Sequence, residues 1–105
     1  MENLNNKDFA QKIKKDKDAI ILDVRTPKEW KEGIIPNALL INLLEPILFQ
    51  QEIAKLNKAK NYYIYCRSGN RSGQACQLMD SKGFNTYNLE GGILQWEEKL
   101  FEPSY

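Results

Sequence analysis

The sequence of 105 residues contains no histidine. Imidazole is the base of Ser-His-Asp hydrolases and of papain-like cysteine proteases, and it is a common ligand of zinc. The lack of histidine therefore excludes both kinds of catalytic site and any zinc site that uses imidazole. A nucleophile in this chain must therefore be activated by charges and hydrogen bonds. We expect it to work without a metal ion or an organic cofactor.

Long hydrophobic runs are also missing, and neither sign of charge predominates. No segment approaches the ~20 apolar residues that cross a bilayer, and the N-terminal segment has no basic stretch leading into an apolar one. The 15 basic and 14 acidic residues leave a net charge of only +1. We therefore expect neither a membrane nor a nucleic acid as partner, and a cytoplasmic location.

Cysteine is scarce as well, with only two residues, Cys66 and Cys76. A domain with a sufficient core needs no disulfide, and a content of 42% hydrophobic residues is enough for one core in a chain of this length. We expect residues 1–105 to form a single domain that is a monomer, with both cysteines as thiols. Cys76 falls inside a predicted helix, where packing in the core is its expected role.

Predicted strands and helices alternate along the chain. Strands are expected at residues 19–24, 39–42, 62–65 and 86–89. Helices are expected at residues 7–14, 46–56 and 93–100 and between Cys66 and Gly83, with a short one beginning at Thr26. This order predicts an α/β fold with a central, mostly parallel sheet of about five strands and helices on both faces. In such folds ligands bind at the carboxyl ends of the strands.

The segment after the strand at 62–65 carries the most informative side chains. Cys66 lies between the end of this strand and the start of a helix, whose free N–H groups attract anions. A thiolate is an anion, so we expect a lowered pKa at Cys66 and a role as catalytic nucleophile. The residues expected to bind the substrate are Arg67, Ser68, Gly69, Asn70 and Arg71. The plainer alternatives are an inert, buried cysteine and two solvated arginines.

Three further residues are predicted to support this site. Asp23 and Arg25 end the first predicted strand, so they should lie at the same edge of the sheet. A salt bridge is the simplest account of this pair, and we expect Arg25 and Glu29 to join a network that holds the rim of the site. Ser72, at the end of the polar segment, is also assigned a supporting role.

Four blocks of the sequence, in this order, resemble a single-domain rhodanese: ILDVRTPKEW, EGIIPNALLIN, YIYCRSGNRS and LEGGILQWE. Together they cover most of the chain. The resemblance implies a sulfurtransferase with a central parallel sheet, in which Cys66 matches the cysteine that accepts a sulfane sulfur as a persulfide. Arg67 and Arg71 match basic residues of the family loop, whose backbone amides surround the persulfide.

The reaction that this resemblance implies has two steps. The Cys66 thiolate attacks the outer sulfur of thiosulfate and sulfite leaves, and a thiophilic acceptor such as cyanide or a thiol then removes the sulfur. The persulfide and the departing sulfite are both anions, and no histidine is needed to move a proton. The chemistry expected from the residues therefore agrees with the resemblance.

The sequence departs from the family at two positions. The family often has histidine and glycine where this chain has Ile34 and Asn37. Ile34 makes this segment less polar, which bears on the choice of acceptor more than on persulfide formation. Asparagine tolerates the left-handed backbone conformation, so we expect the turn at Asn37 to persist.

Two other functions are alternatives to a sulfurtransferase for small molecules. A sulfur carrier or interaction module would pass its sulfur to another protein, with Trp30, Lys31 and Arg67 on the rim as candidate contacts. A cysteine phosphatase would hold phosphate in a similar loop. Phosphatases of that kind place five residues between cysteine and arginine, whereas four separate Cys66 from Arg71, which favours sulfur.

Overall fold

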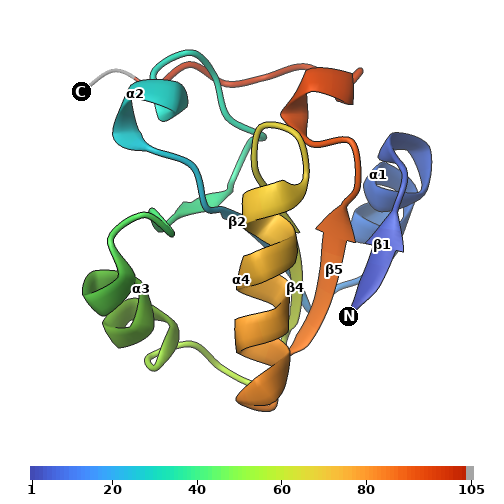
Figure 1. Ribbon diagram of the computed structural model, residues 1–105. Coiled ribbons are helices and arrows are strands. Elements are labelled where there is room, and N and C mark those ends of the chain that lie inside the picture. The colour runs from blue at the N-terminus through green and yellow to red at the C-terminus, as the bar shows by residue number, and fades with distance from the viewer. Residues whose placement is uncertain (104–105) are drawn as a thin grey trace.

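The computed structural model describes residues 1–103 and shows a five-stranded sheet with helices on both sides (Figure 1). The strands are β1 (Glu2–Leu4), β2 (Ala19–Asp23), β3 (Leu39–Leu40), β4 (Asn61–Tyr65) and β5 (Asn85–Leu89). The helices are α1 (Asn6–Lys15), α2 (Pro27–Trp30), α3 (Pro46–Ile53), α4 (Asn70–Ser81) and the 3-10 turn η1 (Ile93–Gln95). The strand order is β1-β5-β4-β2-β3, and all neighbouring strands are parallel.

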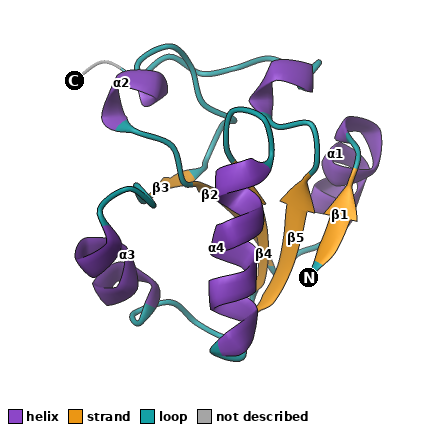
Figure 2. Cartoon of the chain, viewed as in Figure 1, coloured by secondary structure: helices purple, strands orange, loops and turns teal. Residues whose placement is uncertain are grey.

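Both faces of the sheet are buried, because successive side chains of a strand point to opposite faces. On β4, Tyr62 and Ile64 pack on one face with residues of α3 and α4, whereas Tyr63 and Tyr65 pack on the other face with residues of α1. Figure 2 shows α4 in front of the strands and α1 behind them. This double burial explains why β2 and β4 read as continuous apolar runs in the sequence.

Most predicted elements are present, with differences at their ends. The helix expected at 46–56 ends at Ile53, and the strand expected at 39–42 has only two residues, at the edge of the sheet. The fifth strand is β1, which the sequence pattern did not reveal. It has three residues and joins the sheet through β5 alone, so it is too short to show a periodic pattern.

The final helix predicted from the sequence is wrong. Only Ile93–Gln95 forms a helical turn, and the backbone of Trp96 is extended, with ψ of 127°. The chain then reaches the segment after α2, where Ile34 and Phe101 exchange two backbone hydrogen bonds of 2.7 and 2.8 Å. The apolar spacing reflects packing instead, since the ring of Trp96 meets that of Phe9 edge-on with centroids 6.0 Å apart.

Three local signals in the sequence are confirmed. Thr26 caps α2 in a reciprocal arrangement with Glu29. After α4, Gly83 adopts a positive φ of +92°, as expected for a residue that ends a helix. Asn37 has a φ of +71°, so it adopts the left-handed turn expected for it.

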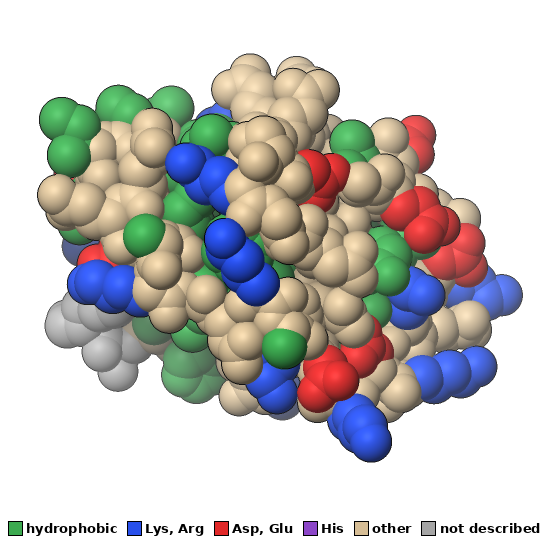
Figure 3. Space-filling model, turned by 90° about the horizontal axis from the view of Figure 1, so that it is seen from below, with side chains coloured by type: hydrophobic (Ala, Val, Ile, Leu, Met, Phe, Trp, Pro, Cys, Tyr) green, Lys and Arg blue, Asp and Glu red, His purple; other side chains and the backbone are tan. Residues whose placement is uncertain are grey.

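The surface carries both signs of charge. Figure 3 shows basic and acidic side chains on one face of the molecule, and hydrophobic side chains gathered at one corner of it. The exposed hydrophobic residues around α3 are Leu44, Ile47 and Leu48. In residues 1–103, none of the helices is long and apolar enough to span a membrane.

Candidate active site

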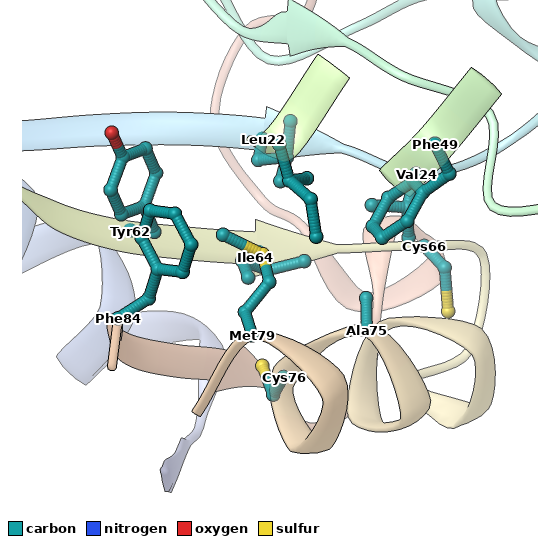
Figure 4. Packing of buried hydrophobic residues seen from close by; sticks show 11 residues of the cluster. Leu22, Val24, Phe49, Tyr62, Ile64, Cys66, Ala75, Cys76, Met79 and Phe84 are labelled. Atoms are coloured by element: carbon teal, nitrogen blue, oxygen red, sulfur yellow. The ribbon is translucent and has the colours of Figure 1, made fainter. Parts of the chain in front are cut away.

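Cys66 lies at the carboxyl edge of the sheet. In the parallel pairing of β2 and β4, Asp23 is opposite Tyr65, so the residues that follow these two strands lie at the same edge. Cys66 follows β4 directly, and its side chain is almost completely buried. Figure 4 shows its sulfur pointing from the end of β4 towards the first turn of α4. The predicted position between a strand end and a helix start is confirmed.

Hydrogen-bond donors from the loop after Cys66 and from the first turn of α4 lie around the sulfur of Cys66. The amide nitrogen of Gly69 lies 3.0 Å from Sγ, and the hydroxyl oxygen of Ser72 lies 3.4 Å from it. Burial raises the pKa of Cys66, but the hydroxyl and amide of Ser72 and the amides of Gly69 and Ser68 outweigh burial and lower the pKa. The lowered pKa expected from the sequence is present, and hydrogen bonds cause it.

Two glycines let the chain after β5 close on the Cys66 loop. Gly69 has a φ of +104°, and a Cβ there would overlap the backbone just after β5. Gly92 has a φ of +66°, and a Cβ there would overlap the carbonyl group of Arg67. The amide of Ile93 also donates a hydrogen bond of 3.0 Å to the carbonyl oxygen of Cys66. Gly69 and Gly92 therefore allow the segment after β5 to pack closely against the Cys66 loop.

Replacing Gly92 with alanine should destabilise the fold by about 1–3 kcal/mol or more. This is the cost of placing a side chain in a backbone conformation that is restricted to glycine. The free energy of unfolding in urea measures this. Gly73→Ala in α4 is a matched control, because a Cβ at Gly73 meets no atom closer than the Nδ2 of Asn88 at 3.7 Å. The control should be neutral or slightly stabilising. Equal stabilities of the two variants would show that no bracing contact exists at Gly92.

Arg71, in the first turn of α4, is held by α2. Its terminal nitrogens donate to the two carboxylate oxygens of Glu29 at 2.8 and 2.9 Å. The hydrogen bonds from Arg71 lower the pKa of Glu29 to about 2, against the effect of burial. Thr26 donates to the same carboxylate, so the cap of α2 and the start of α4 are joined. The rim network predicted for Arg25 and Glu29 is divided in the structure, because Glu29 accepts from Arg71 whereas Arg25 bonds to Asp23.

Asp23 and Arg25 form the salt bridge expected from the sequence. Both are buried, and Nη2 of Arg25 lies 2.8 Å from Oδ2 of Asp23. The same nitrogen donates to the carbonyl oxygen of Gly33 at 2.7 Å, which ties the end of β2 to the segment after α2. These contacts suit the supporting role predicted for the pair.

The remaining candidates separate into exposed and buried residues. The side chains of Arg67, Ser68 and Asn70 are exposed, and of these three residues Ser68 contributes its backbone amide to the sulfur of Cys66. Cys76 is buried in the core, and burial raises its pKa to about 11, which confirms its packing role. In residues 1–103, no group of three His, Cys, Asp or Glu side chains is placed to hold a metal ion.

The order of these features along the chain is that of a known family. A family model described as a rhodanese-like domain matches residues 5–99. The chain belongs to the rhodanese-like domain family. It is 36% identical over 95 residues to a sulfurtransferase of Allochromatium vinosum, and the match covers 89% of this chain and 85% of that protein.

A second rhodanese-like relative is YtwF of Bacillus subtilis, which carries a provisional sulfurtransferase name. It is 38% identical over 89 residues, which cover 85% of this chain and 84% of YtwF. A solved structure of a rhodanese-like domain protein from Staphylococcus aureus superposes with a TM-score of 0.86 at 33% identity, covering 99% of this chain and 100% of that chain. The predicted rhodanese-like α/β fold is confirmed.

Asn88 is a residue of this rhodanese-like site that sequence reasoning missed. It lies on β5, it is buried, and its Oδ1 accepts a hydrogen bond from the hydroxyl of Ser72 at 2.5 Å. The position of Asn88 in the strand could have revealed it from the sequence. Alternation along β5 puts Asn88 on the same face as Thr86, which bonds to Asp80 of α4, and a buried amide on that face needs a partner.

Proposed function

We propose that this rhodanese-like protein is a sulfurtransferase that takes a sulfane sulfur from thiosulfate or a similar donor and carries it as a persulfide on Cys66. One observation supports this most. The Sγ atom of Cys66 lies 3.0 Å from the amide of Gly69 and 3.4 Å from the hydroxyl of Ser72, and such donors stabilise an anionic sulfur. The sulfurtransferase names of the two relatives agree with this chemistry.

The proposed reaction restores the enzyme after two displacements. The Cys66 thiolate attacks the outer sulfur of thiosulfate, the bond between the two sulfur atoms of the donor breaks, and sulfite leaves with the electron pair. A nucleophilic acceptor, cyanide or a thiolate, then attacks the terminal sulfur of the persulfide. The new sulfur bond forms on the acceptor, giving thiocyanate or a new persulfide, and Cys66 leaves as the thiolate.

The loop residues have different proposed roles in these steps. The backbone amides of Ser68, Gly69 and Ser72 face the sulfur of Cys66, so they would stabilise negative charge there. The exposed guanidinium of Arg67 would attract an anionic donor. Arg71 is already paired with the carboxylate of Glu29. We therefore expect it to hold the loop in shape and to donate hydrogen bonds to the sulfur donor while it remains bonded to Glu29.

Mass spectrometry of the intact protein tests the loading step. After incubation with thiosulfate and removal of excess donor, the protein should gain the mass of one sulfur atom on the peptide that contains Cys66. Cyanide should remove this mass and release thiocyanate. An unchanged mass with fully reduced Cys66, or a gain on Cys76 instead, would refute the proposal.

The acceptor distinguishes an enzyme for small molecules from a sulfur carrier. The exposed hydrophobic residues Leu44, Ile47 and Leu48 around α3 favour the carrier as a second candidate, because they offer a surface for a protein acceptor. Slow transfer to cyanide and small thiols, with a mixed disulfide to a protein at Cys66, would support the carrier. Hydrolysis of an aryl phosphate without any sulfur donor would instead support a phosphatase.

A further inference from the structure

Asn88 joins the Cys66 loop to the edge of the sheet through three hydrogen bonds. Its Oδ1 lies 2.5 Å from the hydroxyl oxygen of Ser72, and its Nδ2 lies 3.0 Å from Oδ1 of Asn3 and 3.3 Å from the carbonyl oxygen of Gly69. Ser72 is 0% exposed and Asn88 is 5% exposed. Because both side chains are buried, these protein groups are their main hydrogen-bond partners.

The hydroxyl of Ser72 has one hydrogen and several acceptors within reach. The acceptors are Sγ of Cys66 at 3.4 Å, the carbonyl oxygen of Gly69 at 3.2 Å and Oδ1 of Asn88 at 2.5 Å. The single hydrogen cannot serve all of them at full strength, and the oxygen of Asn88 is the nearest. Asn88 and the sulfur of Cys66 are therefore competing acceptors for the same hydroxyl hydrogen.

The orientation of the Asn88 amide follows from its surroundings. Both contacts of Nδ2 are to oxygen atoms, on Asn3 and Gly69, so the amide donates both of its hydrogens there. Turning the amide over would place its oxygen against the carbonyl oxygen of Gly69 with no hydrogen between them. Oδ1 of Asn88 must therefore face Ser72.

We propose that Asn88 is a positioning residue that competes with the sulfur of Cys66 for the hydroxyl hydrogen of Ser72. In the thiol form, Cys66 donates to the oxygen of Ser72 and Ser72 donates to Asn88, so each donor has an acceptor. When the thiol releases its proton to solvent, the hydroxyl turns to the sulfur and loses its bond to Asn88. Asn88 thus favours the neutral thiol.

Ionisable groups near the sulfur come from several elements. They are Arg71 on α4 with its partner Glu29 on α2, Asp23 with its arginine after β2, and Cys76 on α4. A neutral replacement of Asn88 leaves each of these charges in place. A change in the titration of the loop cysteine therefore reports the redirected hydroxyl.

The variant Asn88→Leu has a similar size and no acceptor. It should lower the pKa of Cys66 by about half to one unit, the value of one hydrogen bond. The rate of alkylation by iodoacetamide as a function of pH measures this pKa, with the adduct on Cys66 quantified by peptide mass. A purely structural role of Asn88 would give the opposite sign, because a loosened loop removes donors from the sulfur.

Two further variants keep the test decisive. Asn88→Asp retains the size and the acceptor and adds negative charge, so it should raise the pKa of Cys66 and slow alkylation at neutral pH. In a Ser72→Ala background, Asn88→Leu should leave the pKa unchanged, because no hydroxyl remains to redirect. A raised or unchanged pKa in Asn88→Leu, or an equal decrease in the Ser72→Ala background, would overturn the proposal.

The role of Asn88 in sulfur transfer rests on the proposed function of Cys66. The alkylation test of Asn88 does not depend on that function. Alkylation needs no sulfur donor or acceptor. A failed alkylation test with normal persulfide loading would remove the role of Asn88 alone. Failed loading with the expected pKa changes would remove the proposed function and leave the competition for Ser72 intact.

Discussion

Cys66→Ser should release sulfite from thiosulfate at least about a thousandfold more slowly than the unchanged protein, and it should gain no sulfur mass. The serine hydroxyl stays protonated at neutral pH and cannot form a persulfide. The chain has no histidine to act as a base for this hydroxyl, so the hydrogen bonds that lower the pKa of a thiol would not make an alkoxide. Sulfite release and intact mass measure the two effects.

Cys76→Ala is the matched control for this prediction. Cys76 is buried in the core and its pKa is raised to about 11, so it should take no part in the reaction. This variant should load one sulfur on Cys66 as the unchanged protein does, with some loss of stability from the small cavity. Sulfite release at the wild-type rate by Cys66→Ser would refute Cys66 as the nucleophile.

Arg25→Met should lower the free energy of unfolding by about 3–5 kcal/mol, because it leaves the buried carboxylate of Asp23 without its partner. Arg25 and Asp23 are 3% and 0% exposed, so water cannot replace the lost guanidinium at little cost. The hydrogen bond from Arg25 to the carbonyl of Gly33 is lost as well. Urea unfolding followed by circular dichroism measures the change.

Two further variants test whether the loss comes from the unpaired buried charge. Lys60→Met removes a cation whose carboxylate partner, Asp18, is exposed to water, and it should cost less than about 1 kcal/mol. A double variant, Asp23→Leu with Arg25→Met, removes both buried charges and should recover much of the loss. If Arg25→Met costs no more than Lys60→Met, the buried pair does not stabilise the rim of the site.

The fold was largely predictable because its signals are local. Apolar runs at β2 and β4 and helical spacing in α1 and α3 each depend on residues close in the sequence. The errors arose where distant contacts override local pattern. The segment from Ile93 onward has helical spacing, but its backbone pairs with Ile34 instead, and Trp96 fills a space beside Phe9.

The candidate site was predictable in position and only partly in its contacts. Cys66 was placed correctly because a strand end followed by a helix start defines one edge of a parallel sheet. The network predicted for Arg25 and Glu29 did not include Arg71, because the sequence does not show which arginine at that edge reaches Glu29. Packing of α2 against the start of α4 brings Arg71, 42 residues away, within hydrogen-bond distance.

The sequence by itself determined the α/β architecture, the place of Cys66 at the end of β4 and the absence of an imidazole base, since these follow from composition and local periodicity. Only the tertiary structure decided which groups donate hydrogen bonds to the sulfur of Cys66 and which acceptors compete for those donors. Ser72 and Asn88 are 16 residues apart and share one hydrogen because α4 lies across β5. Hydrogen bonds form only within about 3.5 Å, and the packing of whole elements sets distances on that scale.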